Sequence, residues 1–114
     1  MCKGTENNLK FIKIQNNLGV INTDALNLPI RKIDAIVTDI PYGRCASSKG
    51  RQTLEMANKF ILCIEPSLSK GRCCVLITPH TVNLNKTEKF EIIGKHEIFI
   101  HKNLTRVVNI LRKK

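Results

Sequence analysis

Tryptophan is absent from this 114-residue chain, and tyrosine occurs only once, at Tyr42. Acidic residues are scarce too: nine Asp and Glu stand against 19 Lys and Arg, which gives a net charge of +10 at pH 7. Such an excess favours a polyanion partner, most simply RNA or DNA, bound through its phosphates. The alternative is a proteome-wide bias toward Lys and Asn, with lysines that are simply solvated. The length fits one domain, and we expect residues 1–114 to form a single unit.

Long apolar runs are also missing. None approaches the roughly 20 residues that a membrane-spanning helix needs, and the first residues lack the apolar segment of a signal peptide. The five cysteines include no Cys-x-x-Cys pair, and Cys63, Cys73 and Cys74 lie in apolar stretches typical of core residues. The three histidines form no ligand pattern, so no metal site is expected. We expect a reduced, cytoplasmic protein.

The most informative segment is a short apolar strand, residues 34–39, that ends in a carboxylate, Asp39. Ile40, Pro41 and Tyr42 follow directly. Open α/β sheets bind their ligands at such strand ends. A carboxylate, the neighbouring backbone carbonyl and a flat ring suit the binding of a planar base through its exocyclic amine. The alternative is an Asp that merely begins a turn before a proline.

The apolar pattern predicts alternating strands and helices. Apolar residues recur at helical spacing over 52–65, and a weaker helical pattern covers 85–93. Residues 3–17 fit a helix or a short strand equally well. Strands are expected at 20–23, 34–39, 72–78, 96–101 and 105–111. This order predicts an α/β sheet in which the last two strands form an antiparallel pair.

Asp39-Ile40-Pro41-Tyr42 resembles the fourth motif, Asp-Pro-Pro-Tyr, of amino-methyltransferases that use S-adenosylmethionine. The flanking Gly43-Arg44, Ser47-Ser48 and Gly50-Arg51, together with the C-terminal stretch 101–112, are similar to the archaeal tRNA guanosine-10 N2-methyltransferase family. The resemblance covers nearly the whole chain but only the later part of that family's catalytic domain. It implies a Rossmann-like class I methyltransferase sheet that ends in a hairpin, and it favours a helix over 3–17.

The resemblance also implies residue roles. Asp39 and the Ile40 carbonyl would hold the target amine, Pro41 would stiffen the turn and Tyr42 would stack on the base. Ile40 replaces the family's first proline, so the turn loses one fixed φ angle.

For the cofactor, the resemblance places the adenine amine at Asp24 and the adenine ring at the backbone N–H of Ala25. The alternative for Asp24 is an aspartate that follows a strand and caps a turn. The implied tRNA substrate would be contacted by basic residues of the loop and the hairpin: Arg44, Lys49, Arg51 and Arg106. Arg106 could instead brace the hairpin, and the other three could be solvated charges of a loop.

Two family features have no counterpart, because the match begins after the family's second strand. They are the glycine-rich loop for the methionine part of S-adenosylmethionine and the acidic residue for its ribose. No Gly-x-Gly-x-x-Gly occurs among the six glycines. We therefore expect an incomplete sheet that lacks its first two strands, with strand 34–39 at an edge. Such a chain would be inactive alone or need a partner chain that supplies the missing half.

Several alternatives stay open at this point. The chain could be half of a split enzyme, a truncated product or a rearranged small domain. The same four-residue motif suits an adenine-N6 methyltransferase of DNA or RNA. A non-catalytic RNA-binding subunit, or pseudoenzyme, would also explain the basic charge.

Overall fold

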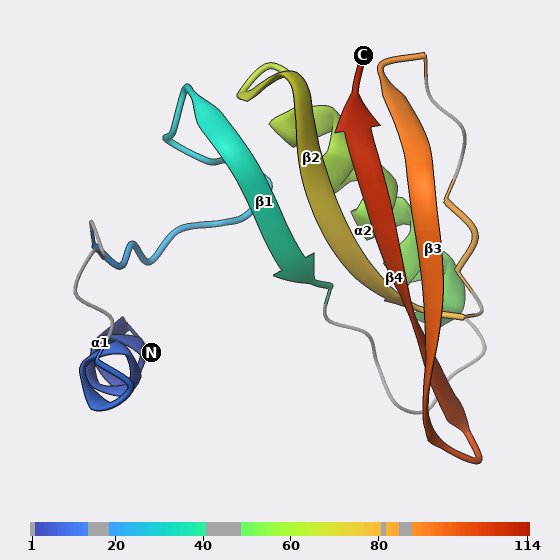
Figure 1. Ribbon diagram of the computed structural model, residues 1–114, viewed down its shortest axis with the longest axis horizontal. Coiled ribbons are helices and arrows are strands. Elements are labelled where there is room, and N and C mark those ends of the chain that lie inside the picture. Colours follow the sequence, from blue (N-terminus) through green and yellow to red (C-terminus); the bar gives the residue numbers. More distant parts are fainter. Residues whose placement is uncertain (1, 14–18, 41–48, 81, 85–87) are drawn as a thin grey trace.

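The computed structural model describes residues 2–13, 19–40, 49–80, 82–84 and 88–114. The elements are α1 (Cys2–Phe11), β1 (Ile33–Asp39), α2 (Lys49–Ile64), β2 (Leu68–Pro79), β3 (Phe90–His101) and β4 (Leu104–Lys113). The strands form one sheet in the order β1-β2-β4-β3. Figure 1 shows α2 behind this sheet and α1 apart from it.

The sheet is mixed. β1 and β2 run parallel, with α2 between them in the chain, whereas β4 is antiparallel to both β2 and β3. The pairing of β1 with β2 shifts between Ile33↔Leu68 and Ala35↔Cys73. Gly71 lies in the extra residues of β2 with a φ of 79°, a conformation that side chains other than glycine rarely adopt. From Ala35 onward the register is regular, so the end of β1 is firmly placed beside β2.

Most of the predicted elements are confirmed, including the amphipathic helix, the strand that ends at Asp39 and the final hairpin. α1 ends at Phe11, earlier than predicted, and residues 14–18 lie outside the described part of the chain.

Two predicted elements are wrong. Residues 20–23 are not a strand. A strand needs a hydrogen-bonding neighbour, and within the described part of the chain β1 pairs with β2 alone. The helix predicted over 85–93 is contradicted from Phe90 onward, where β3 begins and pairs with β4. Pairing with β4 and burial of Phe90, which is 5% exposed, override the weak helical pattern there.

The core lies between α2 and one face of the sheet. Ala57, Phe60, Ile61 and Ile64 of α2 pack with buried residues of the strands, among them Leu68, Cys74, Leu76, Phe90 and Leu111. Burial raises the pKa of the Cys74 thiol from 9.0 to about 12, with a smaller contribution from Cys73. Cys74 therefore stays protonated and serves as an apolar core residue, as predicted, while Cys63 and Cys73 are half-buried.

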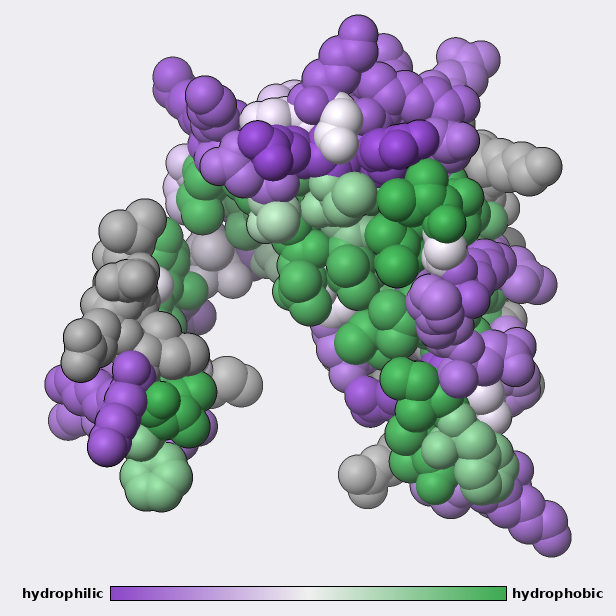
Figure 2. Space-filling view, in the orientation of Figure 1, coloured by the Kyte–Doolittle hydropathy of each residue, from purple (hydrophilic) through white to green (hydrophobic). Residues whose placement is uncertain are grey.

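The opposite face of the sheet carries apolar side chains that no described element covers. Val37, Val75 and Ile110 lie side by side on β1, β2 and β4, and Val37 is 75% exposed. Figure 2 shows this apolar surface across the middle of the sheet. β1 is an edge strand, as predicted.

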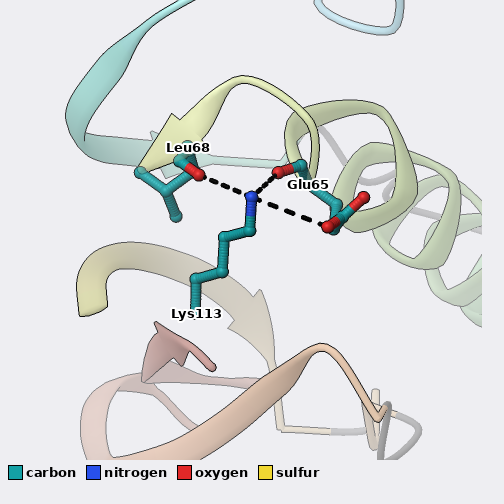
Figure 3. A network of polar contacts seen from close by, with 3 residues as sticks. All are labelled: Glu65, Leu68 and Lys113. Atoms are coloured by element: carbon teal, nitrogen blue, oxygen red, sulfur yellow. Dashed lines mark hydrogen bonds and ion pairs between the residues drawn. The ribbon is translucent and has the colours of Figure 1, made fainter. Parts of the chain in front are cut away.

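Lys113 joins the end of β4 to the turn between α2 and β2 (Figure 3). Its Nζ donates to the backbone oxygens of Glu65 and Leu68, the latter at 2.7 Å, and lies 3.5 Å from the Glu65 carboxylate. Because Lys113 is mostly buried, these three oxygens compensate the desolvation of its charge.

Within the described residues, no helix is long and apolar enough to cross a membrane. The same residues contain no group of His, Cys, Asp or Glu arranged to hold a metal ion.

Asn109 is the polar residue that ties β4 to β2 inside the core. It is 1% exposed, and its Nδ2 lies 3.0 Å from both the Leu76 oxygen and the Thr78 hydroxyl, and 3.3 Å from the Val107 oxygen. We predict that Asn109→Ala lowers the free energy of unfolding by about 1–3 kcal/mol, since buried hydrogen-bonding groups lose their partner. Urea unfolding measures this loss. Asn103→Ala, in the exposed β3–β4 turn, should stay within about 0.5 kcal/mol of the parent, and equal stability of all three proteins would contradict the role of Asn109.

Candidate functional site

The candidate site begins at the carboxyl end of β1. Asp39 is the last residue of the strand and pairs with Ile77 of β2. The next residue, Ile40, donates its N–H to the Ile77 oxygen at 3.2 Å, and its side chain is 4% exposed within the core. Because side chains alternate along a strand, Asp39 lies on the opposite, uncovered face, where its side chain is 40% exposed. The first two residues of the motif are thus fixed, with the carboxylate presented outward.

Arg106 of β4 lies against this carboxylate. Its Nη1 is 2.6 Å from Asp39 Oδ2, and its side chain is 34% exposed. β2 separates the two strands: Asp39 pairs with Ile77 and Arg106 with Pro79. The arginine expected to contact RNA or brace the hairpin therefore forms an ion pair with the motif carboxylate, across the end of β2.

The backbone beside Arg106 is also held by β2. The N–H of His80 donates to the Thr105 oxygen at 2.9 Å, and His80 Nδ1 lies 3.3 Å from the same oxygen. The β2–β4 pairing therefore continues one residue past Pro79 and Arg106. This contact fixes the backbone position of Arg106.

Asp24 and Ala25, the predicted adenine contacts, lie in an exposed turn instead of following a strand. Asp24 Oδ1 accepts the N–H of Leu26 at 2.9 Å, and the Asp24 backbone oxygen accepts the N–H of Asn27 at 2.9 Å. The carboxylate thus stabilises its own turn, and no described contact links this turn to Asp39. These residues do not form a complete site for S-adenosylmethionine.

The other predicted site residues are not placed by the structure. Pro41, Tyr42 and Arg44 lie outside the described residues. Lys49 and Arg51 belong to the first turn of α2, and the positions of their side chains are not described. The described site therefore consists of Asp39, Ile40 and Arg106.

Sequence reasoning missed the contact between Asp39 and Arg106, which are 67 residues apart. Their opposite charges were the only signal in the sequence. Their closeness depends on the strand order, which places β4 next to β2 and not next to β1.

Comparisons with known proteins agree on one family. The family described as RMKL-like, methyltransferase domain, matches residues 1–108. The chain is 33% identical to the tRNA (guanine(10)-N2)-dimethyltransferase of Methanothermobacter thermautotrophicus, over 99% of this chain and 34% of that protein. It is 32% identical to the probable tRNA (guanine(10)-N2)-dimethyltransferase of Methanothermococcus thermolithotrophicus, over 99% of this chain and 69% of that protein.

Solved structures confirm the fold class. The crystal structure of TrmN from Thermus thermophilus superposes with a TM-score of 0.72 at 15% identity, over 98% of this chain and 33% of that one. The putative methylase HI0767 from Haemophilus influenzae gives 0.65 at 14% identity, over 99% of this chain and 66% of that one. The chain thus has the Rossmann-like methyltransferase fold in partial form, and it spans about a third of the length of its Methanothermobacter relative.

A double-mutant cycle on Asp39 and Arg106 tests whether their ion pair forms in solution. We predict that Asp39→Ala and Arg106→Ala are less than additive, with a coupling free energy of about 0.2–1 kcal/mol, because both side chains are partly exposed. Urea unfolding of the four proteins at low salt measures the coupling, which should shrink as salt is added.

The pair of Glu91 and Arg112, 2.8 Å apart on adjacent strands, provides the matched control cycle. Strictly additive effects at Asp39 and Arg106, alongside measurable coupling at the control pair, would contradict the contact.

Proposed function

Since this chain belongs to the family of RMKL-like methyltransferase domains that includes the archaeal tRNA guanine-N2 methyltransferases, we propose that it is the base-binding part of an S-adenosylmethionine-dependent tRNA guanine-N2 methyltransferase. The observation that carries the proposal is the carboxylate of Asp39, fixed at the end of β1 and exposed on the uncovered face. S-adenosylmethionine supplies an electrophilic methyl group when it is bound.

The task of the chain is to hold the guanine amine. This nitrogen is a poor nucleophile because its lone pair is delocalised into the ring. In the proposal, Asp39 accepts one N–H and the Ile40 carbonyl accepts the other, which orients the nitrogen and lets its lone pair localise. The contact between the Ile40 N–H and Ile77 supports this role, because it fixes the backbone next to the carboxylate. Orientation of reacting groups supplies up to about 7–11 kcal/mol of a barrier.

The rest of the motif completes the proposed base site. Tyr42 stacks on the guanine, an interaction worth about 1–3 kcal/mol, and Pro41 stiffens the turn. Arg44, Lys49 and Arg51 follow the motif closely and contact phosphates of the tRNA. The base must leave its stack to reach Asp39.

The cofactor site is proposed to require a second segment or a partner chain. Asp24 and Ala25 contribute the adenine contacts, and the rest of the site comes from the part of the relatives that this chain does not match. The exposed edge of β1 and the uncovered apolar face support this division, since both are surfaces that a folded protein normally covers. We expect the chain alone to transfer no methyl groups.

A chimera in which this chain replaces the matching third of the Methanothermobacter relative tests the proposal. We predict that it methylates tRNA, and that Asp39→Ala reduces the rate about 100-fold or more, as loss of an orienting group does, while tRNA binding is kept. Incorporation of labelled methyl groups into a tRNA transcript measures the rate.

Asp34→Ala is the matched control, because Asp34 is an exposed carboxylate on the same strand. Its rate should equal that of the parent chimera. Full activity of Asp39→Ala would contradict the proposed role, and methylation of adenine in duplex DNA instead of tRNA would favour the adenine-N6 alternative.

A further inference from the structure

We propose that Arg106 is a positioning residue for Asp39: it holds one carboxylate oxygen and so aims the other at the guanine amine. The inference rests on the proposed function, but it concerns a contact that the motif alone does not specify. Arg106 Nη1 lies 2.6 Å from Asp39 Oδ2. Oδ1 of the same carboxylate is the oxygen left to accept the amine N–H.

The contact is unusual because it passes over a whole strand. Adjacent strands lie about 4.8 Å apart, so β1 and β4 are separated by roughly 10 Å. Asp39 pairs with Ile77, whereas Arg106 pairs with Pro79, so Asp39 and Arg106 are also offset from each other along β2. Only a long side chain spans this separation, and arginine combines the length with a rigid, planar group of donors.

Arg112 provides an internal comparison. It lies on the same strand and contacts Glu91, its direct register partner on β3, at 2.8 Å. Such a pair is the ordinary cross-strand arrangement of opposite charges. Arg106 instead reaches beyond its neighbouring strand, β2, and contacts the carboxylate of Asp39 at the end of β1. Cross-strand charge pairing alone therefore does not account for Arg106.

The carboxylate of Asp39 needs a partner that sets its orientation. The terminal torsion of an aspartate is broad, so an exposed carboxylate has no single orientation. A charge-assisted hydrogen bond to one oxygen selects an orientation and thereby sets the direction of the other. An error of about 1 Å in the placement of a reacting group costs roughly 100-fold in rate.

The competing role for Arg106 is a contact with an RNA phosphate, and the two roles differ in measurable ways. A residue that binds a phosphate contributes about one unit to the slope of log K against log salt. A residue that acts through Asp39 contributes to the rate of the bound complex and leaves this slope unchanged.

The first experiment examines the contact in the full chain by NMR, through the side-chain carboxyl carbon of Asp39. Arg106→Gln keeps a polar side chain but removes both the charge and the reach of the guanidinium group, and Arg112→Gln is the matched control on the same strand. We expect Arg106→Gln to shift the Asp39 resonance and Arg112→Gln to leave it in place. If the chemical shift of the Asp39 carboxyl carbon is unchanged in Arg106→Gln, the proposal is overturned.

The second experiment uses the chimera described above, with the same two variants. We expect Arg106→Gln to lower kcat about 10- to 100-fold, with an unchanged KM for tRNA and an unchanged salt slope. Arg106→Lys should restore part of the loss, and Arg112→Gln should match the parent. Asp39→Ala combined with Arg106→Gln should be no slower than Asp39→Ala alone, because Arg106 acts only through the Asp39 carboxylate.

A salt slope that falls by about one unit in Arg106→Gln, with kcat unchanged, overturns the positioning role and makes Arg106 a phosphate contact. A parent chimera that methylates no tRNA overturns the proposed function itself. A parent that is active and an Arg106→Gln variant that equals it overturn only the role of Arg106.

Discussion

The parallel pairing of β1 with β2 is the constraint on which the candidate site depends. It places Asp39 opposite Ile77 and fixes the backbone of Ile40 through the Ile77 oxygen. β2 pairs on its other side with β4, so the same strand end also receives Arg106. Two residues 67 positions apart therefore meet because one strand serves as the neighbour of both. Disruption of β2 would separate the carboxylate from both of its supports.

The two faces of the sheet have different roles. The face under α2 contains the core. Asn109 ties β4 to β2 through buried polar contacts, and Lys113 ties β4 to the turn after α2 through partly buried ones. The other face presents apolar side chains (Figure 2), and it also carries the outward carboxylate of Asp39. This asymmetry agrees with a chain that spans 34% of its Methanothermobacter relative. It also agrees with the proposal that this chain holds the base and that other protein completes the cofactor site.

The sequence predicted the elements whose signals are local. Helical spacing identified α2, and the apolar runs identified β1, β2 and the final hairpin. It failed where the outcome depends on a neighbour: residues 20–23 have strand-like composition but no strand beside them, and Phe90 joins β3 because β4 lies next to it. The motif led to Asp39, but the contact with Arg106 required the strand order and a register offset across β2, which no local pattern encodes.

The central claim is that this chain holds the base while the cofactor site needs additional protein. Calorimetric titration with S-adenosylmethionine tests it most directly, on the full chain alone and on the chimera with the Methanothermobacter relative. The account predicts no binding by the chain alone and one molecule bound per chimera. Binding of one equivalent by the chain alone would contradict it, because this chain would then form a complete cofactor site by itself.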